Sequence, residues 1–117
     1  MKKFLTSFLF ALNGLKTAVV EQLNLKIQIA VAVLVVAAGL HFDITNTEWA
    51  ILIFTIGLVL GFELLNTALE NLVDLVTMEK KPLAGKVKDI AAGAVLLVSV
   101  LSVVVGWLIF KSYLFAD

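Results

Sequence analysis

The chain has 117 residues, of which 62% are hydrophobic, and its mean hydropathy is +1.08. A water-soluble domain of this size could not bury so much apolar surface, so the composition excludes an ordinary soluble fold and favours one all-α integral membrane domain. Nine lysines balance nine acidic residues, so the net charge is zero and no nucleic acid partner is expected. The absence of cysteine excludes disulfides and thiolate chemistry.

Residues 1–22 are predicted to form an amphipathic helix that lies at the membrane interface. Apolar residues recur there at helical spacing, and lysine, serine, threonine and asparagine occupy much of the rest. A signal peptide is the alternative, but no small-residue cleavage site follows a compact apolar core.

Three transmembrane helices are predicted after this segment, over residues 25–42, 49–76 and 90–110. The third contains 21 residues without a charge, which is enough to cross a hydrocarbon layer of about 30 Å. The second is longer than a bilayer needs, so its last two turns are expected to emerge from the membrane, and residues 77–88 are expected to form a loop. Lysines gather in the first quarter of the chain and in this loop, so the positive-inside rule predicts a multi-pass protein with a cytoplasmic N-terminus.

Four polar residues interrupt the second predicted span. Their spacing places them within about 80° on one helix face: Glu63, Asn66, Glu70 and Asp74. Carboxylates at membrane depth are costly and usually mark a functional site. Glu63 and Glu70 lie about 10 Å apart along the axis, too far to share one small cation. The spacing fits two separate roles: one carboxylate binds Mg²⁺, and the deeper Glu63 acts as a general base toward a substrate. Interhelical hydrogen bonding and an ion or proton path are the alternatives.

A second polar group lies between residues 79 and 89. It combines lysines with acidic residues, a composition that suits a nucleotide phosphate and its metal: Glu79, Lys80, Lys81, Lys86, Lys88 and Asp89. On lysine count alone, a positively charged loop near anionic lipid is the simpler interpretation. The Walker pattern is absent, so a nucleotide site here would be non-standard.

Two strings resemble the prokaryotic diacylglycerol kinase family, the small bacterial integral-membrane lipid kinases that include the undecaprenol kinases. They are ELLNTALE at 63–70 with VD at 73–74, and KDIAAGAV at 88–95. The family pattern E-x-x-N-[ST]-A-x-E-x-x-[VI]-D, followed by K-D about fourteen residues later, is matched at every position. The segment 77–84 looks closer to the branch that phosphorylates undecaprenol, and the resemblance covers nearly the whole chain.

This resemblance implies a homotrimeric lipid kinase of the bacterial cell membrane that uses ATP and Mg²⁺ to phosphorylate a membrane lipid alcohol. Undecaprenol is the favoured acceptor and diacylglycerol the second; a non-enzymatic oligomeric channel or scaffold is the alternative function. The implied roles are Glu63 as catalytic base, Glu70 as metal ligand, and Asn66 and Asp74 as supporting residues. The implied nucleotide contacts are Lys3, Phe10, Glu70, Glu79, Lys80, Lys81, Lys88 and Asp89.

The chain departs from the family at one position. The family has a second metal-binding glutamate before the first span, where an ungapped alignment places Gln22, with Glu21 one residue earlier. A glutamine carbonyl can ligate Mg²⁺ but brings no negative charge. Either Glu21 reaches the metal, or Gln22 binds it weakly, or the site is impaired.

Overall fold

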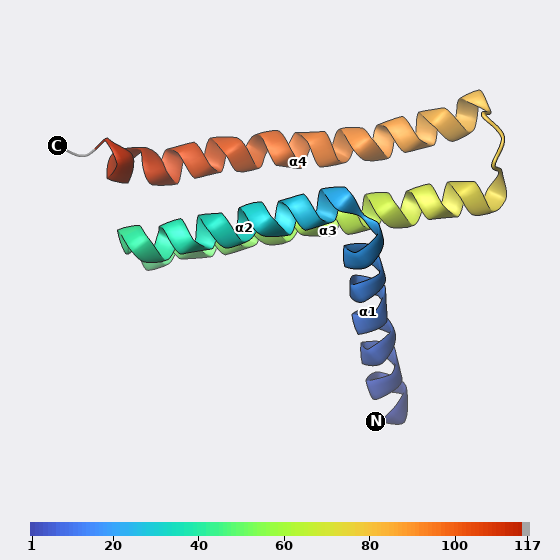
Figure 1. Ribbon diagram of the computed structural model, residues 1–117, viewed down its shortest axis with the longest axis horizontal. Coiled ribbons are helices and arrows are strands. Elements are labelled where there is room, and N and C mark those ends of the chain that lie inside the picture. Colours follow the sequence, from blue (N-terminus) through green and yellow to red (C-terminus); the bar gives the residue numbers. More distant parts are fainter. Residues whose placement is uncertain (116–117) are drawn as a thin grey trace.

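The computed structural model describes residues 1–115, which form four helices joined by short connections (Figure 1). They are α1 (Lys2–Glu21), α2 (Leu23–Phe42), α3 (Asn46–Val76) and α4 (Pro82–Leu114). No strand occurs in these 115 residues, so the predicted all-α class is confirmed for the described chain. Each helix is long and apolar enough to cross a membrane by length and composition. The division into three spans and one interfacial helix therefore stays a prediction.

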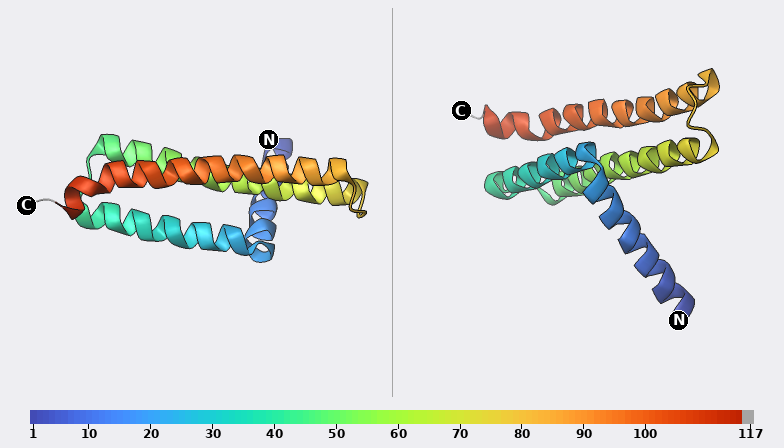
Figure 2. Two further views of the ribbon diagram at one scale, coloured as in Figure 1. Left: turned by 90° about the horizontal axis from the view of Figure 1, so that it is seen from above. Right: turned by 45° about the vertical axis from the view of Figure 1, so that its right-hand side comes forward.

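α2, α3 and α4 run alongside one another, whereas α1 projects away from them (Figures 1 and 2). α3 and α4 are antiparallel and make the most extensive helix pair. α2 packs along the N-terminal part of α3. With 31 and 33 residues, α3 and α4 both exceed the roughly 20 residues that span a hydrocarbon layer. Both helices extend past the start of α2 toward the α3–α4 connection (Figure 1). The extended part of α3 carries the C-terminal residues of its polar face.

The corner between α1 and α2 is a single extended residue. Gln22 has φ −108° and ψ 112°, so it belongs to neither helix and turns the chain sharply. In α1, which precedes this corner, the large apolar side chains are exposed, including Phe4 and Phe8. Only Ala18 is buried. An exposed apolar face on a projecting helix is what an interfacial location would require.

At the opposite end of the molecule, α2, α3 and α4 meet in a small hydrophobic core. Ile44, Leu52 and Ile109 are its buried members. Gly39 permits close packing there, because a Cβ atom at this position would lie 2.7 Å from Cη2 of Trp49. This core joins α2, α3 and α4 at the end away from the α3–α4 connection (Figure 1).

The short α2–α3 connection is held by local hydrogen bonds. Asp43 ends α2 in the left-handed conformation with φ 52°, and Thr45 begins α3 with a capping box that includes Glu48. The hydroxyl of Tyr113 donates a hydrogen bond to the same Glu48 carboxylate, so the end of α4 is tied to the start of α3.

The loop predicted over residues 77–88 is shorter in the structure, because α4 begins at Pro82. Proline is favoured at the first helical position, since its φ is already helical and its missing N–H would have no partner there. Residues 82–88 are therefore helical. As a result, Lys88 and Asp89 are held on the first turns of α4 rather than in a loop.

Candidate active site

The polar face of α3 stays intact in the structure, because the helix is continuous from Asn46 to Val76. Glu63 is the most buried of its members, with 3% of its surface exposed, and the other three are half-buried. Each of the three carboxylates has a different hydrogen-bond partner. These partners come from α2, from α3 itself and from α4 in turn.

Glu63 faces α2. The Gln28 side chain donates a hydrogen bond from Nε2 to Oε2 of Glu63 at 3.3 Å. The Thr67 hydroxyl, which is also buried, donates to the Glu63 backbone carbonyl at 3.0 Å. The sequence interpretation gave no role to Gln28. The signal available was an uncharged amide between Ile27 and Ile29, two residues after Lys26 at the start of a long apolar run.

Glu70 is held within α3. The Asn66 side chain donates from Nδ2 to Oε1 of Glu70 at 3.1 Å. The Asn66 carbonyl oxygen Oδ1 is buried and accepts no hydrogen bond from any residue in 1–115. The Glu70 carboxylate and the Asn66 amide oxygen are both hard oxygen donors of the kind that Mg²⁺ prefers.

Asp74 faces α4. Its Oδ1 accepts a hydrogen bond from Nζ of Lys88 at 2.7 Å, and both side chains are partly exposed. The pair forms because the α3–α4 connection is short and the helices are antiparallel, which places the second turn of α4 opposite the last turns of α3. The two polar groups found separately in the sequence thus meet in one place.

The other residues predicted to contact the nucleotide are exposed and lie away from the polar face of α3. Glu79 and Lys81 form a loose pair, with 3.8 Å between Nζ and Oε2, on the exposed connection before α4. Lys80 and Asp89 are also exposed. On α1, the predicted contacts Lys3 and Phe10 are exposed and belong to the projecting helix.

The two candidates for the second metal ligand lie at the α1–α2 corner. Glu21 is exposed at the end of α1, and Gln22 is half-buried in the turn. Within residues 1–115, no three His, Cys, Asp or Glu side chains gather where they could hold a metal ion. A single chain thus brings Asn66 beside Glu70 but does not complete a three-carboxylate cluster.

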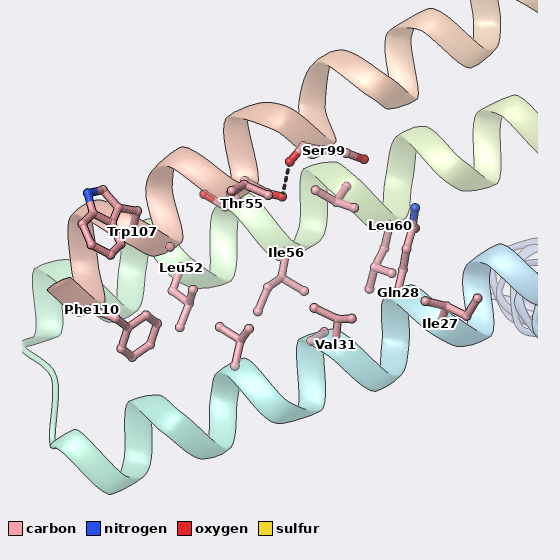
Figure 3. A pocket seen from close by; sticks show the side chains of 16 residues that line it. Ile27, Gln28, Val31, Leu52, Thr55, Ile56, Leu60, Ser99, Trp107 and Phe110 are labelled. Carbon is pink, nitrogen blue, oxygen red and sulfur yellow. Dashed lines mark hydrogen bonds between the residues drawn. The ribbon is translucent and has the colours of Figure 1, made fainter. Parts of the chain in front are cut away.

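A cavity of about 400 Å³ lies between α2, α3 and α4, and its walls are mainly apolar (Figure 3). Gln28 and Leu60 line the end nearest Glu63, and Trp107 and Phe110 line the other (Figure 3). The Thr55 hydroxyl in the wall donates to the backbone of its own helix. The Gln28 amide, in contrast, reaches across to Glu63 on the neighbouring helix.

A strongly apolar helical chain with one buried and two half-buried carboxylates on one helix face is a small membrane protein with a polar site among its helices. Residues 9–110 match the sequence profile of the prokaryotic diacylglycerol kinases. The chain therefore belongs to the prokaryotic diacylglycerol kinase family, a family of lipid kinases. The family resemblance inferred from the two sequence strings is confirmed, and so is the enzyme class.

Individual relatives show how broad this similarity is. The undecaprenol kinase of Bacillus subtilis is 38% identical over 110 residues, covering 94% of this chain and 89% of the relative. The diacylglycerol kinase of Synechocystis is 42% identical over 103 residues; the match covers 87% of this chain but only 59% of that longer relative. The diacylglycerol kinase of Escherichia coli K12 is 27% identical over 95 residues, covering 81% of this chain and 78% of the relative.

Proposed function

We propose that this protein transfers the γ-phosphate of ATP to the hydroxyl of a membrane lipid alcohol. The observation that carries the proposal is Glu63, a carboxylate with 3% exposure inside an apolar helix of a lipid kinase family member. Undecaprenol is the favoured acceptor and diacylglycerol the second. The broad similarity to an undecaprenol kinase, which covers 94% of this chain, supports that order.

In this proposal Glu63 is the general base. A lipid hydroxyl can reach a carboxylate at this depth from within the hydrocarbon, whereas ATP approaches from water. Glu63 takes the hydroxyl proton as the oxygen forms its bond to the γ-phosphorus, and ADP leaves. The Thr67 hydroxyl donates to the Glu63 backbone carbonyl and not to the carboxylate, so it does not compete with the lipid hydroxyl for the carboxylate oxygens.

Glu70 and Asn66 are the proposed magnesium ligands of this chain. Mg²⁺ in nucleotide sites keeps several waters and is bound by one or two carboxylates together with phosphates, so a small donor set is sufficient. The Glu70 carboxylate and the unpaired Asn66 oxygen fit that requirement. When bound, Mg²⁺ neutralises phosphate charge. Glu21 or Gln22 is the proposed further ligand.

Lys88 is the proposed phosphate-binding cation. Its ion pair with Asp74 holds the ammonium group beside the polar face of α3, one turn of that helix beyond Glu70. The further nucleotide contacts proposed are Lys3, Phe10, Glu79, Lys80, Lys81 and Asp89. These residues are spread over α1, the α3–α4 connection and α4, and the metal candidates do not gather in one chain. Both facts support sites shared between subunits, and a homotrimer is the assembly that the family resemblance implies.

We also propose that α2, α3 and α4 span the bacterial cell membrane, while α1 lies on its cytoplasmic surface. The projecting position of α1 and its exposed apolar face support this arrangement (Figure 2). The lysines of α1 and of the α3–α4 connection support a cytoplasmic location for both.

The decisive experiment supplies purified protein with Mg-ATP and offers undecaprenol and diacylglycerol side by side. The proposal predicts phosphate transfer to a lipid alcohol, with loss of turnover but retained nucleotide binding in Glu63→Gln. Asp43→Asn is the matched control, because it makes the same carboxylate-to-amide change at an exposed residue of the α2–α3 connection, and asparagine tolerates the left-handed conformation found there. A channel or scaffold predicts no ATP consumption. Near-normal turnover by Glu63→Gln would remove the base assignment.

A further inference from the structure

The Glu63 carboxylate has one side-chain partner among residues 1–115. This partner is Gln28, which lies 35 positions earlier on a different helix. The Thr67 hydroxyl contacts only the Glu63 backbone, so it cannot orient the carboxylate. The rotamer of the proposed base is therefore controlled from α2.

The orientation of the Gln28 amide is dictated by Glu63. With the opposite assignment of nitrogen and oxygen, the amide carbonyl would lie against the carboxylate, where two acceptors repel each other. The observed orientation points Nε2 at Glu63 and leaves Oε1 buried, without a hydrogen bond from any residue in 1–115. A buried carbonyl without a partner is unfavourable.

The contact itself points to the carboxylate. An apolar side chain of similar length, such as methionine, would fill the same space at the end of the cavity but would give Glu63 no hydrogen bond. The amide N–H of Gln28 instead goes to the buried carboxylate, although its own oxygen stays unpaired among residues 1–115. A polar side chain whose hydrogen bond is directed at the proposed base suggests a role in the reaction.

We infer that Gln28 is a positioning residue that holds the Glu63 carboxylate, through its amide N–H, in the orientation needed to take the proton of the lipid hydroxyl. The inference rests on the proposed function, because it assigns Gln28 a task in the same reaction. One carboxylate oxygen of Glu63 is bound to Gln28, and the other is left free for the hydroxyl. Figure 3 shows Gln28 at the end of the cavity with Leu60 and Ile27 beside it.

The test is Gln28→Met, which keeps the length of the side chain and removes the amide. Hydrogen bonds to charged groups change equilibria by factors of about 10 to 100, so we expect kcat to fall by roughly that factor while KM for ATP is unchanged. Gln28→His returns an N–H donor at similar reach and should recover most of kcat. Asn24→Leu is the matched control, since it removes an exposed amide one turn earlier on α2 and should leave kcat unchanged.

Thermal unfolding in detergent checks that each variant is folded. Gln28→Met leaves the buried Glu63 carboxylate without its donor, so kcat is compared well below the Tm of both proteins. Unchanged kcat in folded Gln28→Met would overturn the inference, and if Gln28→Met does not fold, Gln28→His carries the test. A loss of kcat that Gln28→His does not recover would also overturn it. If Glu63→Gln is inactive while Gln28→Met is normal, only the positioning role fails; if the wild type phosphorylates no lipid alcohol, the proposed function itself fails.

Discussion

The ion pair between Asp74 and Lys88 joins the two polar groups of the candidate site, and Asp74→Asn should weaken the use of ATP by releasing Lys88. The distance from Nζ to Oδ1 is 2.7 Å, which is a charge-assisted hydrogen bond. Asparagine keeps the size of the side chain but removes its charge. The Lys88 side chain, which is long and flexible, then regains conformations that point away from the polar face of α3.

The size of this effect follows from exposure. The Lys88 and Asp74 side chains are 40% and 42% exposed, so water and salt screen the pair. Pairs of this kind couple by about 0.2–1 kcal/mol, well below the 3–5 kcal/mol of a buried pair. A coupling near the upper end, about 1 kcal/mol, corresponds to roughly a fivefold increase in KM for ATP. The increase in KM should be smaller at high salt, because the Debye length shortens and the ion pair is screened more strongly.

The assay is a double-mutant cycle on KM for Mg-ATP with Asp74→Asn, Lys88→Gln and the double variant. If Asp74 acts only through Lys88, the double variant should match Lys88→Gln alone, and Lys88→Gln should have the larger single effect. Lys111→Gln, at the far end of α4, is the control for loss of one positive charge on the same helix.

Two results would refute this reasoning. Additive effects in the double variant would show that Asp74 and Lys88 act independently. A lower KM for ATP in Asp74→Asn would show that Asp74 competes with phosphate for Lys88 instead of positioning it.

Three further variants test the metal site and the packing. Glu70→Gln should raise the Mg²⁺ concentration needed for half-maximal turnover several-fold, because the only carboxylate of the proposed donor pair is lost; an unchanged requirement would contradict its ligand role. Gln22→Glu should lower that concentration by adding negative charge at the corner of α1 and α2, and identical Mg²⁺ dependence would exclude Gln22 as a ligand. Gly39→Ala should lower the free energy of unfolding by about 1–3 kcal/mol, because the new Cβ would lie 2.7 Å from Cη2 of Trp49. Gly14→Ala, where nothing lies within 4 Å of an added Cβ, should show no such loss in a thermal unfolding measurement.

Much of the helical architecture could be predicted before the structure. The long apolar runs predicted an all-α chain, and the helices Leu23–Phe42 and Asn46–Val76 begin within three residues of the predicted spans. The last helix begins at Pro82, inside the predicted loop 77–88 and eight residues before the predicted span. Lysines gathered around Pro82 suggested a loop, but proline at the first helical position starts a helix as readily as it breaks one.

The partners of the polar residues were less predictable. Lys88 and Asp74 were both selected from the sequence, but nothing in their spacing indicated that they pair, since this depends on how the α3–α4 connection folds back. Gln28 was missed because an amide near the start of an apolar helix carries no motif. Its importance comes from the residue that it contacts.

The sequence by itself determined which residues share the polar face of α3, because helical periodicity is a local property of consecutive residues. Glu63, Asn66, Glu70 and Asp74 must lie together wherever that helix is placed. Only the tertiary structure decided what each carboxylate meets: Gln28 from α2 for Glu63, and Lys88 from α4 for Asp74. Such contacts join segments far apart in the chain, and their geometry follows from the packing of whole helices, on which local periodicity carries no information.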